Sequence, residues 1–179
     1  MPIEANYQVY YGMQLDHYSH IWGGITYNRF LWTEFPNENL SSTPTAQILT
    51  ADFIYPRTIG KTDLDGVAEG HFTIYNNSTT SASTVTSYTV TLLKTADVPN
   101  SMETLGSYSN VISTFNSVAT HNYLTLPMYI PISKQILEYN EKLILRIAFS
   151  TTTSELCICQ MNDSTDVDIQ IKIPFAATG

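Results

Sequence analysis

Residues 166–175 read Asp-Val-Asp-Ile-Gln-Ile-Lys-Ile-Pro-Phe, and this stretch indicates the fold class most clearly. Polar and apolar side chains alternate along it, which is the period of a β-strand with one face in water and the other in a core. Its inward face would carry Val167, Ile169, Ile171 and Ile173. The same alternation recurs through most of the chain and predicts a protein built mainly from half-buried strands.

Similar runs bounded by turn residues predict further strands. The run with the highest β-propensity is 84–94, and we expect it at or near the centre of a sheet. Along 122–132 the apolar residues share one face, while Pro127 and Pro131 share the other. Because proline cannot donate to a ladder, we expect this strand at a sheet edge or over a bulge. The other predicted strands are 7–11, 25–32, 49–55, 71–75, 142–150 and 156–160.

The segment 101–118 is open to two interpretations. Its apolar residues also fit helical spacing, but Gly106 and five Ser or Thr residues between positions 104 and 114 are poor helix formers. A loop followed by a strand is favoured, and a short helix is the alternative. Turn residues predict turns at 60–66 and 151–154, and the polar run 76–84 predicts a loop exposed at a tip.

Strands without a dependable helix predict an all-β protein, an antiparallel β-sandwich of jelly-roll type with about eight to ten strands. A chain of 179 residues is long enough to bury one good core, and no linker long enough to divide it is visible. We predict a single β-sandwich domain over 25–179, preceded over 1–24 by an N-terminal arm or interface segment.

Composition and charge exclude several classes of function. The formal net charge is −8, and the eight Lys and Arg residues are scattered along the chain. Both features argue against sequence-independent binding of nucleic acid. No apolar run is long enough to predict a membrane span, and no signal peptide is visible at the start of the sequence. Only 13% of the residues are charged, so the surface is polar but largely uncharged, as in extracellular, virion or adhesive proteins.

No motif predicts an enzyme or a bound cofactor. A Gly-x-Ser-x-Gly nucleophile elbow is missing from the sequence. Cys157 and Cys159 are expected to be small buried thiols, with a metal site or an intermolecular disulfide as the alternatives. Three small groups of possible metal ligands occur, and packing or plain turns are the favoured interpretation of each, with calcium the alternative at the two acidic groups. The groups are Asp16 with His17 and His20, Asp63 with Asp65, and Asp163 with Asp166 and Asp168.

Aromatic residues are unusually dense between positions 7 and 32, in excess of what a small pair of strands could bury alone. Aromatic side chains are enriched at protein interfaces and on sugar-binding surfaces, whereas filling the core is the simpler alternative. We predict that this segment forms a subunit or assembly interface. Its candidate residues are Tyr7, Tyr10, Tyr11, Tyr18, Trp22, Tyr27, Phe30 and Trp32.

The chain resembles small β-sandwich proteins that decorate or cement the heads of bacterial and archaeal tailed viruses. The stretches that carry the resemblance are 60–66 through 87–92, then 126–132 followed by 141–147, a pattern of strands and turns. The resemblance implies a jelly-roll-like virion protein, a homo-oligomer and often a trimer. It also implies that the protein binds the outer surface of the capsid, contacts the major capsid protein and has no catalytic residues. An acidic, Thr-rich exterior suits the outside of a particle better than its DNA-facing interior.

A carbohydrate-binding or adhesin-like module is the alternative from another class. Such a module needs a shallow site with exposed aromatic rings and a few polar partners, and Tyr27, Trp32 and Asn28 could supply them. The two hypotheses differ in what they require of Trp22 and Trp32. Burial in a contact between subunits favours assembly, whereas rings that line an open groove favour sugar binding.

Overall fold

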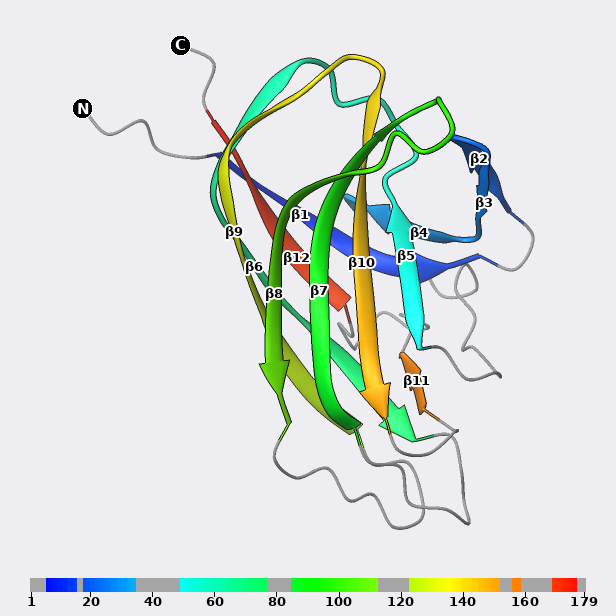
Figure 1. Ribbon diagram of the computed structural model, residues 1–179, viewed down its shortest axis with the longest axis vertical. Coiled ribbons are helices and arrows are strands. Elements are labelled where there is room, and N and C mark those ends of the chain that lie inside the picture. Colours follow the sequence, from blue (N-terminus) through cyan, green and yellow to red (C-terminus); the bar gives the residue numbers. More distant parts are fainter. Residues whose placement is uncertain are drawn as a thin grey trace.

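The computed structural model confirms the all-β prediction (Figure 1). It describes residues 6–15, 18–34, 49–76, 85–112, 123–151, 156–158 and 169–176. These residues form twelve strands and contain no helix. No membrane-spanning helix is therefore present in this part of the chain. The strands are β1 (Asn6–Gln14), β2 (His20–Trp22), β3 (Ile25–Tyr27), β4 (Arg29–Trp32), β5 (Thr50–Ile54), β6 (Thr62–Asn76), β7 (Val85–Ala96), β8 (Glu103–Val111), β9 (Tyr123–Leu137), β10 (Glu141–Thr151), β11 (Leu156–Ile158) and β12 (Ile169–Phe175).

Ten strands join one large sheet that folds over onto itself, and β2 and β3 form a separate hairpin (Figure 1). The order in the large sheet is β11-β6-β12-β1-β4-β5-β10-β7-β8, and β9 pairs with the free side of β6. The pairing is antiparallel as predicted, except for one parallel contact between Phe30 of β4 and Ile54 of β5. One layer of the sandwich is therefore β9-β6-β12-β1, and the other is β5-β10-β7-β8.

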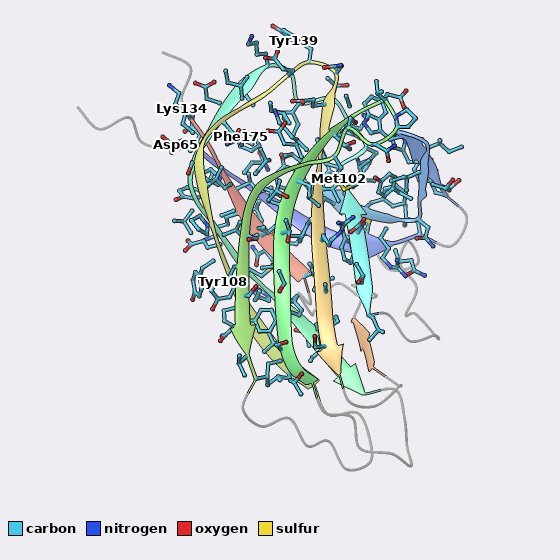
Figure 2. All side chains as sticks on the ribbon, viewed as in Figure 1. Asp65, Met102, Tyr108, Lys134, Tyr139 and Phe175 are labelled. Carbon is cyan, nitrogen blue, oxygen red and sulfur yellow. The ribbon has the colours of Figure 1, made fainter. Side chains whose placement is uncertain are left out.

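The main core lies between these two layers, where side chains fill the space (Figure 2). Phe72 of β6 reaches across to Tyr88 of β7 at 5.2 Å between ring centroids and to Phe149 of β10 at 5.7 Å. Ile169 and Ile171 of β12 are fully buried. This confirms the prediction that the isoleucines of residues 166–175 face the core. Each such side chain contributes about 1.5–3 kcal/mol by leaving water.

A second core cluster lies on the outer face of β5 and β10, under the β2–β3 hairpin. It consists of Met13, Tyr27, Phe30, Ile54, Leu93 and Ile144, all buried. Because the hairpin covers this face, β5, β7 and β10 carry apolar residues on both sides, as in Leu143-Ile144-Leu145. The hairpin is thus part of the folded domain.

The outer strands β8 and β9 meet along a seam. Tyr88 Oη donates a hydrogen bond of 2.8 Å to the carbonyl oxygen of Pro127, and the rings of Tyr108 and Tyr129 pack edge-to-face at 5.8 Å. Gly106 lies so close to Pro131 that an added Cβ would stand 2.3 Å from its carbonyl oxygen. β9 takes part in a ladder only with β6 among the described strands, which confirms the edge position predicted from its prolines.

Several local predictions differ from the structure. The predicted turn over 60–66 is wrong, because β6 already begins at Thr62 and a bulge at Gly66, with φ of +123°, absorbs the irregularity. The helical alternative for 101–118 is wrong over 103–111, which form β8. β1 pairs with both β12 and β4, so residues 6–14 lie inside the large sheet and do not extend from the domain as an arm.

Other predictions fall outside the described residues. They concern the loop from position 77 to 84, the turn at 152–154, the end of the strand predicted over 156–160, and four groups of side chains. Those side chains are Asp16 with His17, the two cysteines, Val167, and Asp163 with Asp166 and Asp168.

Candidate functional site

The eight aromatic residues of the predicted interface divide into three groups. Tyr10, Tyr27 and Phe30 are buried at 2%, 4% and 1% exposure, so within one chain they belong to the two cores. Tyr11, Trp22 and Trp32 are half-buried. Tyr7 and Tyr18 are exposed at 51% and 52% and are the members of the set that a partner could reach most fully.

The β2–β3 hairpin is built by its turn. Gly23 and Gly24 have φ values of +57° and +77°, the left-handed conformations that a two-residue hairpin turn of type I′ requires. Trp22 and Ile25 stand opposite each other across the ladder, as do His20 and Tyr27. Directly opposed residues share a face, so these four side chains lie on one side of the hairpin, and Ile21 lies on the other.

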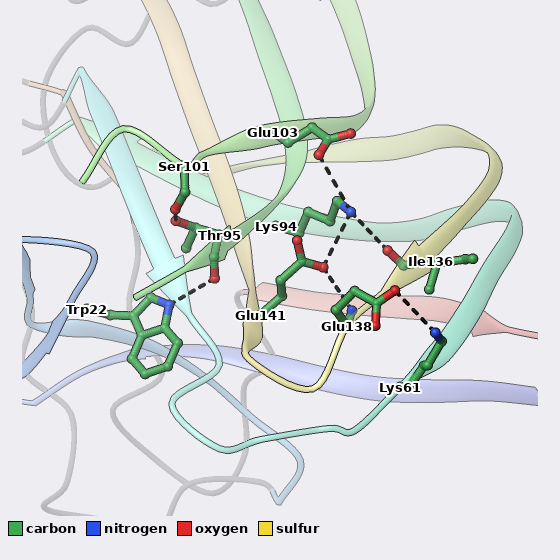
Figure 3. Close-up of polar contacts among 9 residues, drawn as sticks. All are labelled: Trp22, Lys61, Lys94, Thr95, Ser101, Glu103, Ile136, Glu138 and Glu141. Carbon is green, nitrogen blue, oxygen red and sulfur yellow. Dashed lines mark hydrogen bonds and ion pairs between the residues drawn. The ribbon is translucent and has the colours of Figure 1, made fainter. Parts of the chain in front are cut away.

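Three contacts hold the hairpin against the end of β7 and the start of β10. Trp22 Nε1 donates to the carbonyl oxygen of Thr95 at 2.8 Å (Figure 3), and the Gly23 amide donates to Asp97 Oδ1 at 2.9 Å. Lys142 Nζ lies 4.4 Å from the centre of the Trp22 ring and donates to the carbonyl oxygen of Pro56. Burial lowers the pKa of Lys142, against the opposing charge of Asp97. The indole is thereby fixed in one orientation.

Aliphatic side chains are left exposed on the hairpin and on the neighbouring β7–β8 turn. Ile21, Ile25 and Val98 are exposed at 68%, 45% and 56%. Pro99 lies beside Gly24, 3.7 Å from the position that a Cβ there would occupy. We call these four residues the hairpin surface. Ile21 lies on the face of the hairpin opposite to Ile25, so the hairpin surface is an exposed apolar projection with two sides. Exposed apolar side chains of this kind are typical of contact surfaces.

The pH dependence of stability should include a contribution from His20. Burial lowers the pKa of His20 in the folded protein, the nearby Lys142 lowers it further, and Asp97 opposes both. As pH falls through about 6.5, the unfolded chain takes up a proton that the folded chain does not, so the free energy of unfolding decreases. We expect the stability difference between wild type and His20→Asn to shrink between about pH 7.5 and about pH 5.5 in urea titrations. Parallel curves for the two proteins would contradict the assignment.

A shallow pocket of about 240 Å³ lies on the outer face of the other layer, where β6 runs between β9 and β12. Glu69 stands opposite Tyr129 on one side and opposite Lys172 on the other, and His71 stands opposite Gln170. The pocket is lined by Glu69, Gly70, His71, Tyr129, Gln170 and Lys172. Three neighbouring strands therefore contribute an aromatic ring, a carboxylate, an ammonium group, an imidazole and an amide to a single surface.

Part of the pocket lining could be recognised from the sequence pattern. Tyr129, Gln170 and Lys172 occupy outward positions of two runs whose alternation is clear, 122–132 and 166–175. The pairing of both runs with β6 is what brings them together, and no local pattern reveals which strands are neighbours.

The residues considered for sugar or metal binding are placed differently. Tyr27 is buried, and the guanidinium carbon of Arg57 lies 4.7 Å from the centre of the Trp32 ring, so these two rings do not form an open platform. Asp63 lies in β6 and faces Lys134, with 3.8 Å between Oδ2 and Nζ. Within the described residues, no three His, Cys, Asp or Glu side chains are grouped closely enough to hold a metal ion.

The fold resembles parts of larger proteins of known structure, whereas no family model and no curated protein matches the sequence. A CocE/NonD family hydrolase from Staphylococcus aureus matches with a TM-score of 0.59 and 13% identity, over 96% of this chain and 37% of that one. An aminopeptidase from a marine sediment archaeon, Thaumarchaeota archaeon, matches with a TM-score of 0.60 and 7% identity, over 94% of this chain and 37% of that one. This chain spans little more than a third of either structure, and the likeness shows a shared β-sandwich fold.

Proposed function

We propose that the protein is a non-enzymatic structural protein of a virion, which binds the outer capsid and stabilises it through protein–protein contacts. The observation that carries this proposal is the hairpin surface. Ile21 and Ile25 are exposed on a hairpin whose position is fixed by Trp22, and Val98 is exposed on the neighbouring β7–β8 turn. A rigid apolar projection loses little conformational freedom when it docks, so it is suited to permanent assembly.

The charge distribution supports a protein partner over a nucleic acid. Lys94 and Lys142 are buried, and Arg146 forms a two-pronged ion pair with Asp52 at 2.8 and 2.9 Å. Lys61 and Lys134 each face a carboxylate, at 3.4 and 3.8 Å. Most of the eight basic residues are thus engaged within the protein, and a net charge of −8 would oppose the approach of a phosphate backbone.

The major capsid protein is the partner we propose, with the hairpin surface, Tyr18 and Tyr7 as contact residues. A homo-oligomer, with a trimer as the expected form, would present several hairpins to the capsid at once. Several weak contacts on one particle add to a strong one, because each later contact forms at high effective concentration.

The test removes the apolar character of the hairpin surface without touching the core. The double variant Ile21→Asp with Val98→Asp should lose capsid binding by about tenfold or more, because two charges would be forced into an apolar contact. The assay is co-sedimentation with heads assembled from the major capsid protein of the same genome, with light scattering to report the oligomeric state.

Val111→Asp is the matched control, since Val111 is 75% exposed on β8 and does not belong to the hairpin surface. It should bind as the wild type does. Undiminished co-sedimentation of the folded double variant would overturn the assignment of the hairpin surface, and no binding by the wild type would overturn the proposed function.

A further inference from the structure

The pocket between β9, β6 and β12 is a second surface with the features of a binding site. It lies on the outer face of the layer opposite to the one that the hairpin covers. Its volume of about 240 Å³ is smaller than that of pockets that enclose a drug-sized ligand, which are about 300–1,000 Å³. A ligand here would rest in the pocket with one side still in water.

The aromatic wall of the pocket is held rigidly. Tyr129 stands between Pro127 and Pro131, whose rings fix the backbone two residues away on either side. Tyr108 of β8 packs edge-to-face against the Tyr129 ring at 5.8 Å and 86°. Tyr129 nevertheless remains 51% exposed, so one part of the ring is supported and another is open. A ring fixed in this way loses little freedom when a ligand stacks on it.

The floor of the pocket is equally constrained. Gly70 lies at its base, where β12 approaches β6 so closely that a Cβ at Gly70 would stand 1.9 Å from the carbonyl oxygen of Gln170. Neither strand can shift there without breaking the ladder between Ile171 and Gly70. The polar groups of Glu69, His71, Gln170 and Lys172 are thus displayed from rigid strands, not from loops.

The chemistry of the lining indicates the class of ligand. The carboxylate of Glu69 and the ammonium group of Lys172 offset each other in the lining, which disfavours phosphate and other strongly charged ligands. Carboxylate, amide, imidazole and ammonium groups together offer both donors and acceptors. A ligand that uses them needs many hydroxyl groups, and one that also stacks on Tyr129 needs a flat apolar face. Sugar rings combine the two.

We propose that this pocket binds a neutral saccharide, with one sugar ring stacked on Tyr129 and its hydroxyl groups bonded to Glu69, Gln170 and Lys172. The site is distinct from the pair Tyr27 and Trp32, which the fold has placed in or against the second core cluster. It is also independent of the hairpin surface. The variant Ile21→Asp with Val98→Asp should therefore keep its affinity for the sugar.

The experiment is an NMR titration of the whole chain with neutral methyl glycosides and with short gluco-, manno- and N-acetylglucosamine oligosaccharides. Inorganic phosphate and a sialylated sugar form the charged arm. The expected result is a saturable shift of amide signals in 69–71, 128–130 and 170–172 with at least one neutral saccharide. The proposal is overturned if no neutral saccharide shifts these signals, or if only the charged compounds do.

Two tyrosine variants locate the binding. Tyr129→Ala should weaken binding by about tenfold, since an aromatic stacking partner is lost. Tyr139→Ala is the matched control, because Tyr139 is 70% exposed in the β9–β10 turn and lies well away from Tyr108, whose ring contacts Tyr129 (Figure 2). It should bind as the wild type does. Equal affinity of the two variants would overturn the role of Tyr129, and unchanged amide spectra away from position 129 would show that the variant is folded.

Discussion

Gly70→Ala should lower the free energy of unfolding by about 3 kcal/mol or more. This is the largest effect that we expect from any glycine-to-alanine substitution in the described residues, because the added Cβ at Gly70 has the shortest contact. The new Cβ would lie 1.9 Å from the carbonyl oxygen of Gln170 and 2.8 Å from Cα of Ile171. Both are backbone atoms of β12, so no side-chain rotation can relieve the contact. β12 would have to separate from β6, and its buried Ile169 and Ile171 would move with it.

Two other glycines provide matched controls for the same chemical change. Gly60 has φ of +98° and no atom within 4 Å of its virtual Cβ, so Gly60→Ala should cost only the backbone strain, about 1–2 kcal/mol. Gly106→Ala would place its Cβ 2.3 Å from the carbonyl oxygen of Pro131, across a seam where no backbone ladder joins the described strands β8 and β9. We expect an intermediate loss. Urea unfolding followed by circular dichroism measures all three, and a Gly70→Ala protein as stable as Gly60→Ala would contradict the argument.

The strands that could be predicted from sequence are those whose signature is local. In β12 and β9 the side chains alternate between core and water, and a period of two residues is visible without knowledge of the neighbours. The edge position of β9 could be predicted too, because Pro127 and Pro131 lack the amide that a second ladder needs.

The start of β6 could not be predicted, because local chemistry pointed to another structure. Asp63, Asp65 and Gly66 are turn residues by preference, and in isolation they favour a bend. Pairing with β9 along 62–75 overrides that preference, and the irregularity survives only as a bulge at Gly66. Asp63 and Asp65 then occupy alternate positions on a strand, where a turn-type calcium site does not form.

The candidate sites depend on tertiary neighbours even more strongly. The sequence shows that positions 7–32 are aromatic, but Tyr10 and Tyr11 are adjacent and lie on opposite faces of β1. The second core cluster forms only because the hairpin folds over β5 and β10. Which aromatic residues stay exposed therefore follows from the packing of elements that are distant in sequence.

Lys94→Met should cost about 3–5 kcal/mol, because Lys94 is a buried charge that joins four strands. Its Nζ donates to the carbonyl oxygen of Ile136 in β9 at 2.9 Å and lies 3.3 Å from Glu141 of β10 and 3.5 Å from Glu103 of β8 (Figure 3). Glu141 also accepts a bond of 2.8 Å from the amide of Glu138. Methionine would keep the volume but leave the side chain of Glu141, only 16% exposed, without its cation.

The comparison with Lys134→Met separates the effect of burial on stability from the effect of removing a charge. Lys134 is 71% exposed and faces Asp63 at 3.8 Å, so its removal should cost no more than about 1 kcal/mol. Glu103→Gln should be similarly mild, since Glu103 is 58% exposed, whereas Glu141→Gln should approach the effect of Lys94→Met. Added salt should erase the Lys134 contribution and spare that of Lys94. Urea titrations measure the free energy of unfolding of each variant. Equal losses of this free energy for Lys94→Met and Lys134→Met would contradict the view that the bond from Lys94 to Ile136 stabilises the contact between β7 and β9.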